Sequence, residues 1–169
     1  MGRVICKIAE TAAERQAHFD VRHRVFVEEQ GLFKGSDVDD YDQHAVLLIA
    51  VEQDTDKVVG AVRCYETEDG VWFGGRLAVL KEARHTAAAV GPRLCRLAEK
   101  VVIERGCQRF LAYIQAQNVR FFERLAWQKV GEPITYCGEP HQLMQASLAA
   151  AKRSKQTPRV QEKLAVVSQ

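Results

Sequence analysis

Apolar and polar residues alternate or recur at helical spacing along most of the chain. Residues 3–9 alternate with a period of two, which is typical of a half-buried strand. Residues 12–29 carry apolar side chains four and seven positions apart behind the capping-box pair Thr11 and Glu14, so this stretch predicts a helix. Residues 31–43, which contain glycines and several aspartates, predict an acidic loop with room for a short second helix.

The remainder of the chain predicts a sheet interrupted by two helices. Runs rich in β-branched residues predict antiparallel strands at residues 45–52, 58–66 and 71–79. Later patterns predict a helix from residue 90 to Gly106, a strand at 110–114, a helix at 118–125, and strands at 127–130 and 141–148. A strand, a helix and a strand in succession form a parallel crossover. The pattern therefore predicts an α/β (α+β) domain over residues 1–149, with a mixed, mostly antiparallel sheet of about seven strands flanked by helices.

Composition narrows the function classes. With 47% hydrophobic and 27% charged residues, the chain resembles ordinary folded domains. The formal net charge is +2, but the last nineteen residues hold five Lys or Arg against one Glu, so the body is slightly acidic. We expect residues 150–169 to form a basic C-terminal tail, frayed or helical. The body lacks the basic stripe that nucleic acid requires.

The sequence contains no membrane segment and no metal motif. The longest apolar run, residues 45–51, is much shorter than the roughly 20 residues of a spanning helix, and residues 1–10 lack the apolar stretch of a signal peptide. The five cysteines form no Cys-x-x-Cys pair and no zinc-like cluster with histidine, which favours reduced thiols. We therefore expect a cytoplasmic protein that binds no metal and no membrane.

The junction between the strand at 71–79 and the helix from residue 90 is a candidate anion site. Small residues fill the loop, and the free N–H groups and dipole of a helix N-terminus suit a pyrophosphate. A tight strand-to-helix turn would explain the same residues, so the segment alone leaves both interpretations open. The later segment from Asn118 to Trp127, with its Phe121-Phe122 pair, favours binding.

Together these two segments resemble the GNAT superfamily of N-acetyltransferases, and the resemblance covers roughly residues 3–149. Leu77-Ala78-Val79 corresponds to the family's Leu-x-Val at a bulged strand end, and residues 118–127 to its Asn and Phe-Tyr-x-x-x-Gly-Phe. The resemblance implies acetyl-CoA as acyl donor and a catalytic role for the Val79 backbone N–H, which would polarise the thioester carbonyl. The coenzyme-binding residues that it implies are Leu77, Ala78, Val79, Arg84, Thr86, Ala87, Ala88, Ala89, Val90, Gly91, Asn118 and Phe121.

Two positions depart from the family pattern. The phosphate loop, Arg/Gln-x-x-Gly-x-Gly/Ala, matches in two registers, residues 84–89 or residues 86–91, and in both the first glycine is alanine. Alanine is tolerable there where φ is negative and costly where φ must be positive. The family's general-acid Tyr is replaced by Phe122, which has no proton for the departing thiolate. The candidate substitutes are Tyr113, Tyr136 and Cys137.

The amino-terminal helix and the acidic loop point to the acceptor. Residues 21–30 resemble a GNAT subgroup with Arg-x-x-Val-Phe-x-x-Glu-Gln and also the acyl-homoserine-lactone synthases, in both of which this region borders the acceptor site. Attack by an amine needs a base, for which the candidates are Glu28, Glu29, Asp40 and His44. His141 is better explained as a structural histidine. As a group the acidic residues favour a cationic acceptor.

These observations predict an N-acetyltransferase that transfers an acetyl group from acetyl-CoA to the amine of a small molecule by direct attack. Two alternatives stay open: an acyltransferase like the acyl-homoserine-lactone synthases, and a non-catalytic CoA-binding sensor or subunit. The sequence does not identify the amine or the oligomeric state, and a homodimer is compatible with it.

Overall fold

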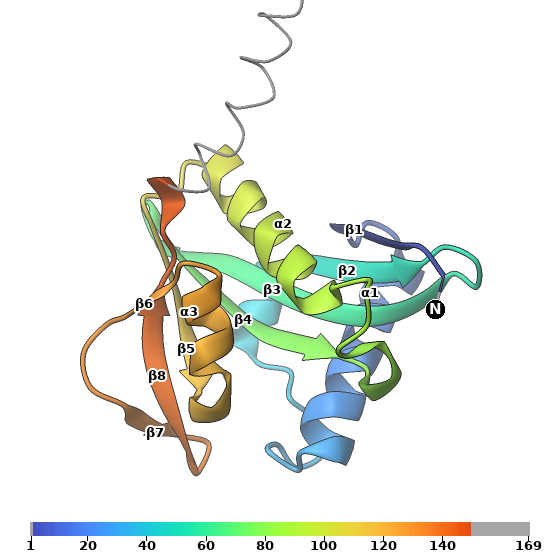
Figure 1. The fold of residues 1–169 in the computed structure, drawn as a ribbon, viewed down its shortest axis with the longest axis horizontal. Helices are drawn as coiled ribbons and strands as arrows, with labels where there is room; N and C mark the ends of the chain where they lie inside the picture. The colour runs from blue at the N-terminus through green and yellow to red at the C-terminus, as the bar shows by residue number, and fades with distance from the viewer. Residues whose placement is uncertain (1, 150–169) are drawn as a thin grey trace, which may run out of the picture.

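A mixed sheet forms the centre of the protein in the computed structural model, which describes residues 2–149, so the predicted tail at 150–169 lies outside the described residues (Figure 1). The strands are β1 (Val4–Ile8), β2 (Val46–Glu52), β3 (Lys57–Glu68), β4 (Val71–Val79), β5 (Arg109–Gln115), β6 (Gln128–Lys129), β7 (Ile134–Tyr136) and β8 (Glu139–Gln145). Neighbouring strands follow the order β1-β2-β3-β4-β5-β8-β6, and β7 pairs with β8. Every pair is antiparallel except β4 with β5. The predicted mixed, mostly antiparallel sheet is confirmed.

Over the described residues the sheet has eight strands rather than the predicted seven or so. The additional strand, β7, lies where the sequence pattern predicted a loop between two strands. Ile134 and Tyr136 pair with His141 and Glu139 of β8, which begins two residues earlier than predicted. All three residues of β7 are exposed, so no alternation of buried and exposed side chains marks it as a strand.

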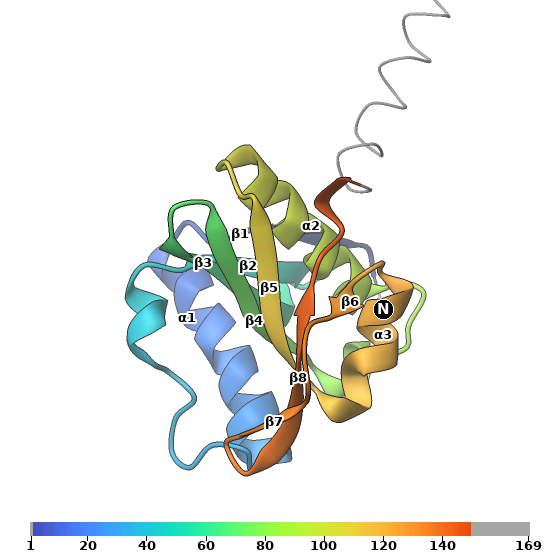
Figure 2. The same cartoon turned by 90° about the vertical axis from the view of Figure 1, so that its left-hand side faces the viewer.

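Helices cover the two faces of the sheet. α1 (Ala12–Arg22) lies on one face, and α2 (Val90–Glu104) and α3 (Val119–Arg124) lie on the other (Figures 1 and 2). Thr11 and Glu14 form the predicted capping box at the start of α1. The shorter helical segments are η1 (His23–Glu29), η2 (Asp40–Gln43), η3 (Lys81–Ala83) and η4 (Ala116–Asn118).

The amino-terminal helix changes its winding part-way along. The sequence predicts one helix over residues 12–29, but from His23 the chain continues as a π-helix, η1. The Gln30 N–H donates to the Val25 carbonyl at 2.9 Å, a five-residue step. Apolar spacing of three and four residues does not distinguish the two windings over so short a stretch, and π segments are frequent beside functional sites.

A gap opens between the two parallel strands. β4 pairs with β5 only at Val71, Trp72 and Phe73, which lie opposite residues 109–111. Beyond these residues the two strands diverge (Figure 1). The β4 strand also carries a bulge. Ala61 of β3 lies opposite Ala78, and Arg63 lies opposite Gly75, so two residues of β4 lie opposite the single β3 residue between these pairs. Arg76 at the bulge has φ +52°, so the strand bends where the gap begins.

His18 is a fully buried polar side chain on the inner face of α1. Its Nε2 atom lies 3.3 Å from Nη1 of Arg22, which can only donate, and its Nδ1 atom lies 3.0 Å from the Leu48 carbonyl. The ring is therefore neutral, with its hydrogen on Nδ1. Burial, the largest cause, lowers the pKa of His18 to about 4.

We expect the free energy of unfolding to fall as pH drops from about 6.5 to about 4. In this window the unfolded chain binds a proton at His18 that the folded chain excludes, so the stabilisation is complete above the unfolded pKa and is lost on acidification. The loss amounts to roughly 3 kcal/mol. Urea unfolding of the protein and of His18→Gln at several pH values measures it. Equal pH dependence in the two proteins would contradict the assignment.

Candidate functional site

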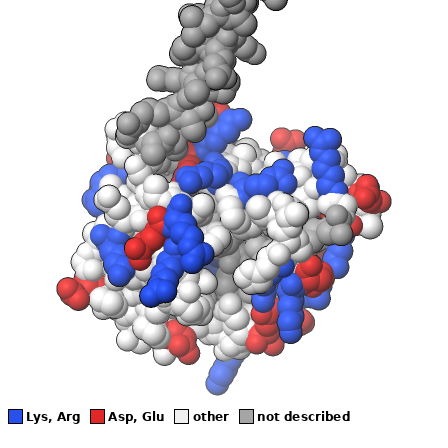
Figure 3. All heavy atoms as spheres, in the orientation of Figure 1, with Lys and Arg blue, Asp and Glu red and all other residues white. Residues whose placement is uncertain are grey.

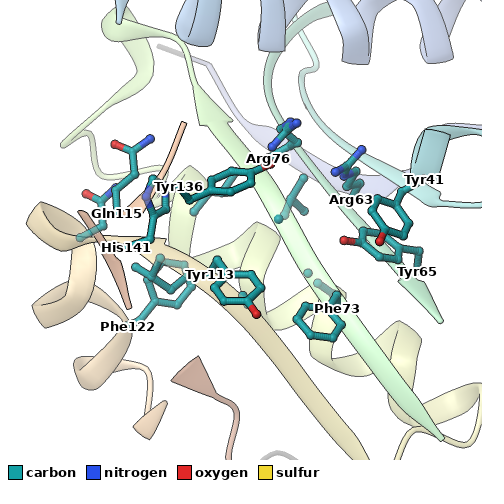
Figure 4. A pocket seen from close by; sticks show the side chains of 18 of the residues that line it. Tyr41, Arg63, Tyr65, Phe73, Arg76, Tyr113, Gln115, Phe122, Tyr136 and His141 are labelled. Carbon is teal, nitrogen blue, oxygen red and sulfur yellow. The ribbon is translucent and has the colours of Figure 1, made fainter. Parts of the chain in front are cut away.

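A cavity of about 400 Å³ lies where the parallel strands diverge. Its walls come from β3, β4, β5, β7 and β8 and from the loop that follows η1. Figure 4 shows its side chains, with Phe73 and Tyr113 on neighbouring strands of the floor and with Gln115, Tyr136 and His141 grouped at one end. Of the residues predicted from the sequence to bind coenzyme, Leu77 and Asn118 line this cavity.

The backbone of Val79 faces the gap between the strands. The Leu80 N–H donates to the Val59 carbonyl of β3 at 2.9 Å, and Val79 lies opposite Gly60 in the same register. Successive residues of a strand point their N–H and C=O groups to opposite sides, so those of Val79 point away from β3. Its carbonyl accepts a 2.8 Å hydrogen bond from Arg84 Nε, and its N–H stays on the gap side.

Three segments that the sequence implicates in coenzyme binding meet at Gly91. A Cβ atom at Gly91 would lie 3.5 Å from Cζ of Phe121 and 3.9 Å from Cγ2 of Val79. The end of β4, the start of α2 and helix α3 are therefore adjacent at this point. The Val90 and Gly91 N–H groups belong to the first turn of α2, where a helix offers no internal acceptor.

The phosphate loop reaches α2 through a strained residue. Ala89 is the N-cap of α2 and has φ +47° and ψ +50°, the left-handed conformation that favours glycine. In the register that spans residues 86–91, Ala89 occupies the position of the family's first glycine and Gly91 that of the second. The backbone conformation favours this register, because a left-handed residue is needed at the position where the pattern has glycine.

We expect Ala89→Gly to stabilise the fold by about 1 kcal/mol. The relief of left-handed strain in the folded state should outweigh the conformational entropy that glycine adds to the unfolded chain. Ala87→Gly is the matched control, since Ala87 lies in the same loop and is not among the residues with positive φ. That control should lose stability by about 0.5 to 1 kcal/mol. Denaturant unfolding measures both variants, and equal effects would argue against strain at Ala89.

Arg84 and Glu29 form an ion pair with two hydrogen bonds. The Arg84 guanidinium donates to both carboxylate oxygens of Glu29, at 2.5 and 2.7 Å, while its Nε binds the Val79 carbonyl. The hydrogen bond from Arg84, the largest lowering cause, holds the pKa of Glu29 below its ordinary value. In this arrangement Arg84 shapes the end of β4 and Glu29 is a poor proton acceptor.

The other predicted residues lie outside the cavity wall. Glu28 and His44 are exposed, as is Asp40, and none of them is among the residues that line the cavity. Ala78 is buried, with its side chain in the core under α1. Thr86 donates its hydroxyl to the Ala83 carbonyl at 3.1 Å. The structure therefore brings Leu77, Val79, Gly91, Asn118 and Phe121 to one region. Of the predicted bases, Glu28, Asp40 and His44 lie outside the cavity wall, and Glu29 lies near the end of β4 only as the ion-pair partner of Arg84.

The acidic loop is neutralised internally. Arg22 is fully buried and donates to Asp37 at 2.7 Å and to both oxygens of Asp42, at 2.6 and 2.9 Å. Asp39 accepts hydrogen bonds from Arg63 at 2.5 and 2.8 Å, and Arg76 approaches the same carboxylate at 3.3 Å. Three arginines therefore balance three aspartates. These three aspartates of the predicted acidic patch therefore form an ion-pair network that holds the loop against β3 and β4, and Asp40 is exposed.

Aromatic rings form a row on the open part of the sheet. Tyr41 and Tyr65 stack with centroids 4.3 Å apart, and the row continues across the strands through Phe73, Tyr113 and Tyr136 at spacings of 5.9 to 6.5 Å. The planes of successive rings differ by 22° or less. The row lines the cavity and ends beside His141, whose ring meets that of Tyr136 edge-on. We call these five rings the aromatic row.

Phe122 stands at the position of the family's general acid. It is buried, lines the cavity and meets the ring of Trp127 edge-on with centroids 5.4 Å apart. Trp127 is held in turn by a 3.0 Å hydrogen bond from its Nε1 to Glu99. The position is therefore part of the packed wall and provides no exchangeable proton.

Comparison with known proteins fits this geometry. The sequence profile of the Acetyltransferase (GNAT) family matches residues 10–127. The chain belongs to the GNAT family of acetyltransferases. The uncharacterized N-acetyltransferase YjcF of Bacillus subtilis (strain 168) is 29% identical over 135 residues, which cover 79% of this chain and 93% of YjcF. The resemblance identified from residues 77–79 and 118–127 is confirmed.

Solved structures of GNAT proteins and their relatives share the fold. The crystal structure of a Lactobacillus plantarum protein described as an N-acetyltransferase superposes with a TM-score of 0.76 at 25% identity. The match covers 87% of this chain and 99% of the other. The CoA-dependent acyl-homoserine lactone synthase BjaI, with SAM and isopentyl-CoA, superposes with a TM-score of 0.67 at 19% identity, covering 86% and 82%. The second likeness shows the fold alone.

Membrane-spanning helices and metal-binding clusters are absent from residues 2–149. Among these residues, no helix has the length and apolar character needed to cross a bilayer. The same residues hold no group of three or more His, Cys, Asp or Glu side chains arranged to bind a metal ion. All five cysteines are free thiols, and Cys64, Cys95 and Cys107 are buried.

Proposed function

We propose that this GNAT protein is an acetyl-CoA-dependent N-acetyltransferase that acetylates a small-molecule amine by direct attack. The observation that carries the proposal is the meeting of Val79, Gly91 and Phe121 beside the gap between β4 and β5. Free backbone donors from two elements face that junction, and no side chain at residue 91 fills it.

The residues at the junction fit a nucleotide thioester. The first-turn N–H groups of α2 would receive the pyrophosphate, because they combine unpaired donors with the positive end of the helix dipole. Lys and Arg side chains are spread over the face that α2 covers, interrupted by a few Asp and Glu (Figure 3). The gap-facing edge of β4 at Leu77 and Val79 would bind the pantetheine arm. Acetyl-CoA would supply the activated acetyl group.

The chain's own groups would then orient and activate the reactants. The Val79 N–H, aimed into the gap, would donate to the carbonyl oxygen that gains negative charge during attack. Asn118, at the cavity rim, and Phe121, beside Gly91, would hold the lower arm and the sulfur end. The packed ring of Phe122 would exclude water from the same region.

The aromatic row indicates the class of acceptor. Its exposed members, Tyr41, Tyr113 and Tyr136, are about half or a third accessible and form an apolar ledge that leads to the gap. Because the nearby carboxylates are paired with arginines, the ledge would recognise an uncharged flat body more than an extended cation. We therefore expect an amine that carries an aromatic or similarly flat group.

Release of thiol from acetyl-CoA across a panel of amines tests the proposal. The panel includes arylalkylamines with and without an oxygen substituent, short alkylamines and linear polyamines. Fastest release with arylalkylamines is expected, and a preference for polyamines would contradict the acceptor class. Coenzyme binding without release for any amine would favour the sensor alternative. S-Adenosylmethionine with medium-chain acyl-CoA forms the last arm, in which turnover would favour the synthase-like alternative.

A further inference from the structure

We propose that His141 is the base that removes the proton from the attacking amine. This proposal rests on the N-acetyltransferase function proposed above and names the proton acceptor, for which the candidates from the sequence were Glu28, Glu29, Asp40 and His44. Its support comes from the position of the ring, from its fixed tautomer, and from the state of the other titratable groups in the cavity.

The ring lies in the cavity wall at the end of β5. His141 pairs in register with Gln115, the last residue of β5, at the mouth of the gap between the parallel strands. Only 4% of the residue is exposed, yet it lines the cavity. Figure 4 shows it beside Tyr136 and Gln115, on the side of the opening where Phe122 also lies. A group at this position is shielded from bulk water and still accessible to a bound acceptor.

The hydrogen bond of the ring sets which nitrogen is basic. His141 Nδ1 lies 2.9 Å from the Glu139 carbonyl oxygen, which can only accept. Nδ1 therefore carries the hydrogen, and in the neutral ring Nε2 holds the free lone pair. Tyr136 on β7 packs edge-on against the ring, and Tyr113 on β5 follows it in the aromatic row. The titratable groups that face it from neighbouring strands are thus phenols, and Glu139 on its own strand is exposed.

The other titratable groups of the cavity are unsuited to the task. Hydrogen bonds from Arg63, with the charge of Arg76, hold the pKa of Asp39 below its ordinary value despite partial burial. Burial raises the pKa of the Cys95 thiol and of the Tyr65 phenol. Phenols and guanidinium groups carry their protons near neutral pH. Among the described residues that line the cavity, His141 is therefore the one whose neutral ring offers a free lone pair on nitrogen.

The reaction balances with a single proton carried by this ring. An acceptor that arrives as an ammonium ion first loses one proton to water and binds as the free amine. As the amide C–N bond forms and the thioester C–S bond breaks, the amine nitrogen loses a second proton to Nε2 of His141. The imidazolium then gives this proton to the thiolate of CoA, which leaves as the thiol. This transfer restores the neutral ring. It also supplies the proton that the family's general-acid Tyr gives to the thiolate and that Phe122 cannot give.

His141→Asn separates this role from a structural one. The Asn side-chain amide can still donate to the Glu139 carbonyl but offers no basic nitrogen. We expect kcat to fall by about a hundredfold or more, with CoA affinity by calorimetry changed less than twofold. The pH dependence of kcat should differ between the wild-type protein and the variant, and added imidazole should restore part of the rate of His141→Ala. His23→Asn, outside the cavity, should leave the rate unchanged.

Side-chain ¹⁵N resonances of His141 provide a readout that needs no coenzyme. The proposal requires that the neutral ring carry its proton on Nδ1. A proton on Nε2 would overturn it, and so would an unchanged pH profile of kcat in His141→Asn. If the wild-type protein bound no CoA, the proposed function would fail, while the resonance of the bare Nε2 would still show whether the ring is built as a base.

Discussion

Arg22→Leu should destabilise the fold by about 3 to 5 kcal/mol, because it leaves two buried carboxylates without their main partner. Arg22 has no solvent exposure, and Asp37 and Asp42 are 2% and 5% exposed. Arg63 and Arg76 still approach these carboxylates, at 2.9 and 3.3 Å, so part of the network survives. Denaturant unfolding at pH 7 measures the loss. Arg24→Leu, two residues further along and exposed, is the control and should change stability by less than about 0.5 kcal/mol.

The loss should shrink in acid. The Arg22 and Arg63 guanidinium groups hold the pKa of Asp42 far below its ordinary value, against the opposing effect of burial. A lowered carboxyl pKa contributes stability that is complete above the unfolded value of about 3.9 and is lost as pH falls further. The variant lacks most of this contribution, so its difference from wild type should decrease below about pH 4. A difference that stays constant down to pH 2 would show that packing, and not charge, is the main role of Arg22.

Gly91→Val should weaken CoA binding at least tenfold. A Cβ at this position already meets Phe121 and Val79 at van der Waals distance, so the two methyl groups of valine would occupy the junction and cover the first-turn N–H groups of α2. Isothermal titration with CoA measures the change. Lys100→Val, at an exposed position further along α2, controls for the lower helix propensity of valine and should bind CoA normally. Unchanged affinity in Gly91→Val would remove the junction from the binding site.

The fold could be predicted because most of its elements bury apolar side chains. β1 alternates, β2 and β3 carry runs of consecutive buried residues, and α2 buries apolar residues at helical spacing. β7 could not be predicted, since all its side chains are exposed and its pairing depends on β8. The π-helix was also missed, because its inward residues Val25 and Phe26 follow the same spacing as those of an α-helix.

The two halves of the site differ in how well the sequence predicts them. The coenzyme side uses backbone groups at the ends of elements, so the motifs at residues 77–79 and 118–127 locate it. The acceptor side depends on contacts between distant residues, such as His141 with Tyr136 and Arg63 with Asp39. One signal was available: Arg22 lies four residues after His18 and four before Phe26, on the inward face of the predicted helix. A charge at such a position requires a buried partner, which the aspartates of the following loop provide.

A titration of ¹⁵N-labelled protein with CoA tests the central claim most directly. The backbone amide resonances of Val79, Val90 and Gly91 should shift together and saturate at one CoA per chain, while those of Glu28 and His44 stay close to their free positions. Saturation without shifts at these three amides, or no saturable change at all, would contradict a coenzyme site at the junction of β4, α2 and α3.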